Sequence, residues 1–366
     1  MKVKEVVQYL EEVAPRSLQE GYDNSGLICG SPGREVSGIL VCLDSTEEIV
    51  EEALSKGANL IVAHHPIVFS GLKSLTGKNY IERTIIKAVK HDVAIYAIHT
   101  NLDNVSHGVN RVIGEKLGVV NQRILAPKKS VLSKVIVYVP KNNVEEVRDA
   151  VFEAGAGEIG NYSDCSFASS GIGTFKGNEQ SNPVVGKINE RHFEDEHRLE
   201  VLVESWKLKK VISAMIRVHP YEEVAYDVVT LENQHTLIGA GGVGDLEDEM
   251  GFEEFLAHVA EQFNCSCIRH TKKVVDKVKR VAFCGGSGSF LLPQAKASGA
   301  DVFITGDFKY HQFFDAEDQI SILDIGHFES EQFTIDLLGA QLREKFPNFA
   351  LHLTEINTNP VNYYTV

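Results

Sequence analysis

Residues 38–66 are GILVCLDSTEEIVEEALSKGANLIVAHHP, and this stretch predicts a strand, a helix and a second strand. The two apolar runs at its ends are rich in β-branched residues, which is typical of buried strands. The segment between them begins with Ser45, a good helix N-cap, and carries acidic residues in its first turn, where they stabilise the helix dipole. The stretch is therefore interpreted as a βαβ unit with parallel strands.

The same alternation continues on both sides of a central interruption. Further helices are predicted over residues 2–13, 80–91, 109–117, 289–300, 308–318 and 329–345. Further strands are predicted over residues 93–100, 280–286, 301–306, 320–327 and 350–356. The predicted fold class is α/β, with a mixed, largely parallel sheet flanked by helices.

Residues 128–235 interrupt this pattern. After Ala126 and Pro127 the predicted elements follow in the order strand, helix, strand, strand, helix, strand, which is the ferredoxin-like βαββαβ arrangement. A chain of 366 residues is also long enough for more than one hydrophobic core. We therefore predict a ferredoxin-like domain at 128–235, inserted into a discontinuous α/β domain that comprises residues 1–127 and 236–366.

Five side chains of the types that bind metals follow apolar runs at distant points of the chain. They are His64, His65, Asp103, His327 and Glu331. Because ligands of open α/β sheets bind beyond the carboxyl ends of the strands, we expect the five to meet in one site for two divalent cations. Imidazole and carboxylate donors leave Zn²⁺, Mn²⁺, Fe²⁺ and Co²⁺ open, with Zn²⁺ as the first choice. The alternative is that they are ordinary polar residues at strand ends.

Three further features near these positions each have two interpretations. His99 and His311 are candidates for an acid, a base or a substrate contact, but a lone histidine is often only a structural hydrogen-bonding group. The turn GGSGS (285–289) either presents backbone N–H groups to an anion or is a tight structural turn. It lacks the lysine of a P-loop and the spacing of a dinucleotide fingerprint.

Two polar segments farther from these positions also have two interpretations each. Asn24 and Gly26 lie in the loop YDNSGLICG (22–30), where they either line the cleft or form a turn. The segment HPYEEVAYDV (219–228) carries His219, Tyr221, Glu222 and Glu223. It is either a ligand site of the inserted domain or a helix-to-strand corner with solvated carboxylates.

Composition excludes several classes of protein. The chain has 36 Lys and Arg against 51 Asp and Glu, a net charge of −15, which argues against nucleic acid as a partner. No apolar run approaches the roughly 18 residues that a membrane span needs, so no membrane partner is expected. The first residues lack the features of a targeting peptide, and the six cysteines suit reduced thiols. We therefore expect a cytoplasmic protein.

The motifs, taken in order, resemble those of a known family. AHHP, HTNLDN, GGSGS, TGD and GHFESE are similar to the Nif-three-like (NGG-one-interacting-factor-three-like) family, whose bacterial members often carry the name GTP cyclohydrolase type 2 homolog. The resemblance covers the whole chain. It implies a dinuclear metal centre with ligands at His64, His65, Asp103, His327 and Glu331. It also implies the long bacterial form, with an insert similar to the PII and CutA-type regulatory fold, and a toroidal homohexamer.

Two functions follow as hypotheses. The first is a metal-dependent hydrolase that acts on a small nucleotide-like or pterin-precursor substrate, and GTP cyclohydrolase-type activity is compatible with such a centre. Its catalytic residue is unassigned beyond the candidates His99 and His311. The alternative is a non-enzymatic metal-binding or regulatory scaffold with a ligand-sensing insert. A ring-shaped clamp on nucleic acid fits poorly with the negative charge.

Overall fold

The computed structural model describes residues 1–364, and the chain divides into two compact units. The discontinuous unit comprises Met1–Pro127 and Thr236–Val366, and the inserted unit comprises Lys128–His235. Each unit has a hydrophobic core of its own. Within the part of the chain that is described, no helix is long and apolar enough to cross a membrane.

The first sheet of the discontinuous unit has five strands. Their order is β1 (Gly26–Cys29), β4 (Ala94–Ala97), β3 (Leu60–Ala63), β2 (Ile39–Cys42) and β15 (Leu351–Leu353). All neighbours are parallel except β1, which is antiparallel to β4. Every residue of β2, β3 and β4 is buried, as expected of parallel strands that are covered on both faces. The helices that pack against this sheet are α2 (Glu47–Ser55), α3 (Tyr80–Lys90) and α11 (Thr334–Lys345). Helix α1 (Val3–Val13) contacts α11, since the Tyr9 hydroxyl donates to the carbonyl of Gln341 at 3.0 Å.

The second sheet of the same unit has six strands. Their order is β11 (Arg269–His270), β14 (Ser321–Asp324), β13 (Val302–Gly306), β12 (Lys277–Ser287), β10 (Gly239–Gly251) and β5 (Val119–Pro127). The central strands β12, β13 and β14 are parallel, and the outer pairs are antiparallel. The accompanying helices are α4 (Thr100–Asp103), α5 (Val109–Lys116), α8 (Phe252–Gln262), α9 (Leu292–Ala297) and α10 (His327–Glu331), with the 3₁₀ helix η5 (Tyr310–Ala316).

The predicted α/β class is confirmed, but the single sheet is replaced by two mixed sheets. The prediction missed β10 because this strand is rich in glycine, which has a low strand propensity. Gly242 of β10 lies so close to the Phe283 ring that an added Cβ would collide with the ring. The glycine is therefore required by close packing against β12. Two predicted helices also differ, because residues 310–316 form a 3₁₀ helix and the predicted helix 329–345 is divided into α10 and α11.

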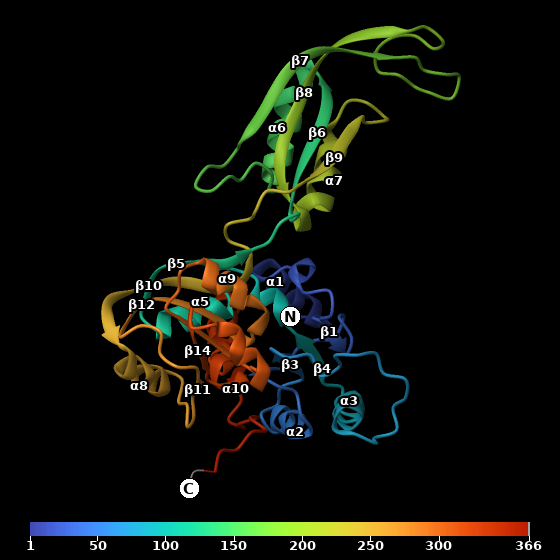
Figure 1. Cartoon of the computed structure of the whole chain (residues 1–366). Helices are drawn as coiled ribbons and strands as arrows, with labels where there is room; N and C mark the ends of the chain where they lie inside the picture. Colours follow the sequence, from blue (N-terminus) through green and yellow to red (C-terminus); the bar gives the residue numbers. More distant parts are fainter. Residues whose placement is uncertain (365–366) are drawn as a thin grey trace. The chain divides into compact units, whose positions relative to one another are not determined.

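The inserted unit contains four strands and two α-helices. They are β6 (Leu132–Pro140), α6 (Val144–Glu153), β7 (Ser166–Phe175), β8 (His192–Glu204), α7 (Leu208–Val218) and β9 (Tyr226–Leu231). Their strands form one antiparallel sheet in the order β7, β8, β6, β9 (Figure 1). Apolar residues of both helices pack with those of β6 and β8 in a single core.

The segment 219–228 forms a corner of the inserted unit. His219 follows α7, and its Nε2–H donates to the carbonyl of Tyr138 at 3.0 Å. Its Nδ1 accepts a hydrogen bond from the backbone N–H of Tyr221 at 3.1 Å. Because both ring nitrogens are engaged by the backbone, the structure favours the helix-to-strand corner over a ligand site for this histidine.

Tyr96 offers a test of packing in the first sheet. Its ring is fully buried in β4, and its hydroxyl has no hydrogen-bond partner among residues 1–364. A buried unpaired polar group costs roughly 1–3 kcal/mol, so we expect Tyr96→Phe to raise the free energy of unfolding by about 1 kcal/mol in urea titrations. Tyr96→Ala, which opens a cavity, should instead lower it by about 3–5 kcal/mol. A Tyr96→Phe variant that is less stable than the wild type would contradict the absence of a partner.

Candidate metal centre

A cavity of about 1150 Å³ lies in the discontinuous unit, where parallel strands of both sheets end. His65 follows β3, Asp307 follows β13, and His327 begins the helix after β14. These three line the cavity together with Asp103 and Glu331. His64, the remaining predicted ligand, is fully buried beside them. The structure therefore brings all five predicted residues together.

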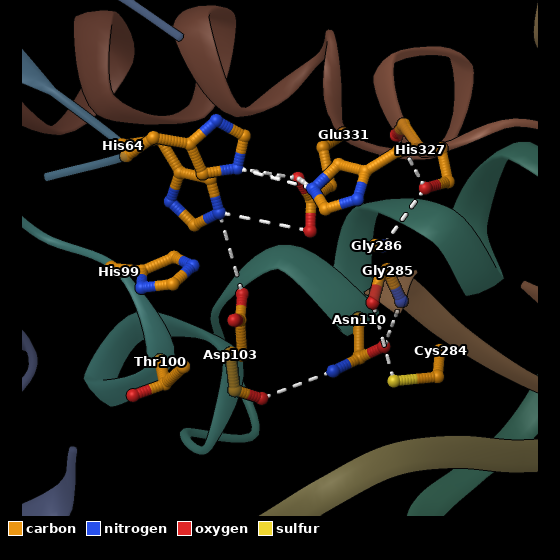
Figure 2. A network of polar contacts seen from close by, with 12 residues as sticks. His64, His99, Thr100, Asp103, Asn110, Cys284, Gly285, Gly286, His327 and Glu331 are labelled. Carbon is orange, nitrogen blue, oxygen red and sulfur yellow. Dashed lines mark hydrogen bonds and ion pairs between the residues drawn. The ribbon is translucent and has the colours of Figure 1, made fainter. Parts of the chain in front are cut away.

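Glu331 stands between two groups of donors. Its Oε2 lies 2.9 Å from His65 Nε2 and 3.1 Å from His327 Nε2. Its Oε1 lies 3.8 Å from His64 Nε2, which in turn lies 3.6 Å from Asp103 Oδ1. Figure 2 shows His64 between Asp103 and Glu331, with His327 beside Glu331. One carboxylate is thus shared by a His–His group and a His–Asp group.

Two buried atoms in the second group have no hydrogen-bond partner within the described residues. They are His64 Nε2 and Asp103 Oδ1. The other nitrogen of His64, Nδ1, donates to the carbonyl of Ile98 at 2.8 Å, so in the neutral ring Nε2 carries the lone pair, and it faces the centre. Unpaired buried polar atoms are costly, and a lone pair opposite a carboxylate is the arrangement that a cation satisfies.

Carboxylates orient the other two imidazoles from behind. His65 Nδ1 donates to Asp44 Oδ1 at 2.8 Å, and His327 Nδ1 donates to Asp307 Oδ2 at 2.7 Å. Asp44 is held in turn by the Thr358 hydroxyl, which donates to its Oδ2 at 2.7 Å. Metal-binding histidines are generally oriented in this way, since the bond at one nitrogen fixes the direction of the other.

The electrostatics of the cavity favour a cation. Burial lowers the pKa of His65, but its hydrogen bonds to Asp44 and Glu331 outweigh burial and raise the pKa to about 9. Burial also opposes protonation of His327, yet the charge of Glu331 and the bond to Asp307 raise its pKa to about 11. Seven of the residues that line the cavity are acidic, against one arginine and no lysine. Protons on the histidines therefore compensate a negative charge that a metal would otherwise neutralise.

Asp103 and Glu331 respond differently to this environment. Burial and the neighbouring charge of Glu331 raise the pKa of Asp103. Burial raises the pKa of Glu331 as well, but the positive charge of His327 and the hydrogen bonds from His327 and His65 hold it well below the ordinary value. The ionised carboxylate at the centre is thus Glu331.

Of the two candidate catalytic histidines, the structure brings only His99 to the site. The His99 ring lies 5.4 Å from the ring of His64 and 5.3 Å from that of His65. Its Nδ1 donates to the buried carboxylate of Asp23 at 2.7 Å. His311 is exposed and does not line the cavity. In the 3₁₀ helix η5, side chains three residues apart line up, so the ring of His311 stacks on that of Phe314. The sequence prediction of His311 as a residue of the site is therefore corrected.

The glycine turn at 285–289 is structural. Its Gly285 N–H donates to Asn110 Oδ1 at 3.1 Å, and its Gly286 N–H donates to Ser330 Oγ at 2.9 Å, so these groups are not free for an anion. Gly286 has φ +59°, and an added Cβ would collide with Glu331 Oε1. The turn therefore allows α10 to approach β12 closely enough to place Glu331 at the centre.

Four residues that bond the predicted ligands or His99 were not predicted from the sequence. They are Asp23, Asp44, Asn110 and Asp307. Asn110 links the two halves of the unit, because its Nδ2 donates to the Asp103 carbonyl while its Oδ1 accepts from the Gly285 N–H (Figure 2). Asp44 and Asp307 each follow the end of a parallel strand, and that position was the available signal.

The raised histidine pKa values predict how the metal-free protein responds to pH. A histidine whose folded pKa exceeds its unfolded value of about 6.5 stabilises the fold fully below that pH. This contribution is lost as the pH rises through about 9 for His65 and about 11 for His327. We expect metal-stripped protein to lose stability between pH 7 and pH 10 in urea unfolding.

Ring-proton NMR of the same sample should show both histidines protonated at pH 7. In a His65→Gln variant, the loss of unfolding free energy near pH 9 should disappear. Titration of both rings near pH 6.5 would contradict the predicted electrostatics.

Comparison with known proteins places the chain in a family. The family model described as Duf34/NIF3 (NGG1p interacting factor 3) matches residues 1–360. A relative from Halalkalibacterium halodurans, named GTP cyclohydrolase 1 type 2 homolog, is 38% identical over 363 residues and covers 98% of each chain. A Bacillus subtilis relative of the same name is 37% identical over 365 residues, also with 98% of each chain covered. The solved structure of a Bacillus cereus protein related to NIF3 matches with a TM-score of 0.85 at 38% identity, and covers 100% of this chain and 99% of that chain. The chain therefore belongs to the Duf34/NIF3 family.

Proposed function

We propose that the discontinuous unit binds two divalent cations and hydrolyses a small nucleotide-like substrate. The observation that carries the proposal is the position of Glu331, whose oxygens face two groups of donors. His64 and Asp103 would complete the site of one cation, and His65 and His327 that of the other. The unpaired Nε2 of His64 and the raised histidine pKa values support the same assignment.

The donor chemistry restricts the choice of metal. The donors of both groups are imidazole nitrogens and carboxylate oxygens, without a thiolate. Such ligands suit Zn²⁺, and also Mn²⁺, Fe²⁺ and Co²⁺. Two cations held in this way would supply Lewis-acid polarisation of a substrate oxygen and a water of lowered pKa.

His99 is the candidate proton carrier. Its Nδ1 is held by Asp23, so its Nε2 is the nitrogen that exchanges a proton with substrate or water. Burial raises the pKa of Asp23, but the hydrogen bond and charge of His99, together with hydrogen bonds from Thr100 and Asn24, outweigh burial and lower it, so Asp23 stays ionised beside the ring. An imidazole oriented by a buried carboxylate is a common general base or acid. The names of the relatives, GTP cyclohydrolase 1 type 2 homolog, make GTP the first substrate to test.

Metal content tests the site directly. Protein purified without added metal should carry about two divalent cations per chain by mass spectrometry, and the double variant His65→Ala/Glu331→Ala should carry none. His311→Ala, an exposed histidine outside the cavity, is the matched control and should keep both cations. Affinity for the cation at His65 and His327 should rise from pH 6 to pH 8, because that cation displaces the protons of these two histidines. A wild-type protein that binds no cation over this range would refute the proposal.

Activity tests the role of His99. With GTP as substrate, His99→Gln should keep its cations and lose about 10²–10⁴-fold in kcat, the usual contribution of general acid–base catalysis. His311→Gln should retain wild-type turnover. If the protein binds two cations but turns over neither GTP nor any other nucleotide or phosphoester, the non-enzymatic metal-binding or regulatory scaffold becomes the better account.

Two further proposals concern the assembly and setting of the protein. The resemblance to the Nif-three-like family supports a homohexamer, which would sediment at six times the chain mass of 40.4 kDa. All six cysteines are free thiols, which supports a reducing, cytoplasmic setting. A sedimentation measurement that gives a monomer would overturn the first proposal.

A further inference from the structure

Two exposed aromatic rings lie at the cavity. Tyr22 is 62% exposed and Phe69 is 47% exposed, although both line the cavity that holds the donor cluster. Their centroids are 6.1 Å apart with planes inclined by 30°. Tyr22 comes from the loop before β1 and Phe69 from the loop after β3. The pair therefore presents open ring surface that no core residue covers.

The pair is continuous with the donor cluster. Phe69 lies 6.0 Å from the His99 ring, in an edge-on arrangement. His99 in turn lies within 5.4 Å of the rings of His64 and His65. A planar group on Tyr22 and Phe69 would therefore be separated from the metal ligands by a single ring, that of the candidate proton carrier.

Hydrogen bonds hold both loops in place without covering the rings. Asn24 Nδ2 donates to the carbonyl of Val68 at 2.7 Å, which ties the residue before Phe69 to the loop of Tyr22. Asp23, beside Tyr22, is anchored by His99 and by the backbone N–H of Thr100. Asn24 thus positions the loop of Phe69 beside that of Tyr22. Because the pair is ordered in advance, a ligand would lose little free energy in arranging it.

We propose that Tyr22 and Phe69 bind a planar heteroaromatic ring of the substrate and so select ring-bearing substrates over ring-free ones. This inference rests on the proposed function of the site and adds the residues that recognise the substrate. Exposed aromatic surface beside a concave polar site is characteristic of ligand binding. Neither side chain carries a charge, so recognition depends on the face of the ring, and stacking tolerates purines and other flat heterocycles alike.

Calorimetric binding to the full-length, metal-loaded protein tests the proposal. The probes are GTP and guanosine, which carry the ring, and inorganic triphosphate, which lacks it. Phe69→Ala and Tyr22→Ala should each weaken binding of GTP and guanosine about tenfold, within the range measured for stacking of one base on an aromatic side chain. Phe69→Tyr should restore binding, and triphosphate binding should not change. Phe314→Ala removes a 66% exposed ring that does not line the cavity, and is the matched control.

Each result separates this inference from the proposed function. Equal weakening of GTP and triphosphate, or no change in either, would overturn the ring site. So would a wild-type protein that binds neither ring-bearing probe more tightly than triphosphate. Ring binding that depends on Tyr22 and Phe69 without any turnover would support the inference while the hydrolase proposal fails. Metal content and melting temperature of each variant show that the fold and the donor cluster are intact.

Discussion

A buried carboxylate, shared by a His–His group and a His–Asp group, is the constraint on which the discontinuous unit depends. Glu331 is 3% exposed, and an ionised carboxylate in such a place is costly unless positive charge and hydrogen bonds surround it. His65 and His327 supply that charge in the metal-free protein. Because these donors come from different sheets, the edges of both sheets must meet at Glu331. The site therefore requires both sheets to fold together, since neither sheet alone could neutralise Glu331.

Charge alternates outward from the centre. Imidazoles surround Glu331, and the carboxylates of Asp44 and Asp307 lie behind two of them. The excess of acidic groups among the lining residues leaves the cavity negative as a whole. Protons can compensate this charge only while the histidines stay protonated, whereas divalent cations compensate it at any pH that keeps the ligands deprotonated. This is why the electrostatics and the donor geometry point to the same occupant.

The two units divide the properties of the chain between them. All donors of the cluster and all residues that line the cavity belong to the discontinuous unit. The inserted unit has a separate core and contributes no donor from its residues 128–235. Its His219 is committed to backbone hydrogen bonds. The proposed ring site of Tyr22 and Phe69 likewise lies in loops of the discontinuous unit.

The sequence by itself determined the fold class and the identity of the cluster. Apolar β-branched runs predict buried parallel strands, and side chains that follow such runs lie at the carboxyl edge of a sheet, which is why the five donors could be named in advance. The four-residue spacing of His327 and Glu331 likewise predicts one helix face, since this depends only on local geometry. Local patterns were sufficient for these features.

Only the tertiary structure decided the rest, because it depends on contacts between segments distant in sequence. The division into two sheets depends on the glycine-rich β10, whose pairing reflects close packing against neighbours and not strand propensity. Which of the two candidate histidines, His99 or His311, lies at the cavity depends on which segment faces it. The bonds of Asp44 and Asn110, and the sharing of the two oxygens of Glu331, join residues that no local pattern relates. Long-range packing sets these distances, and the chemistry of the site depends on them.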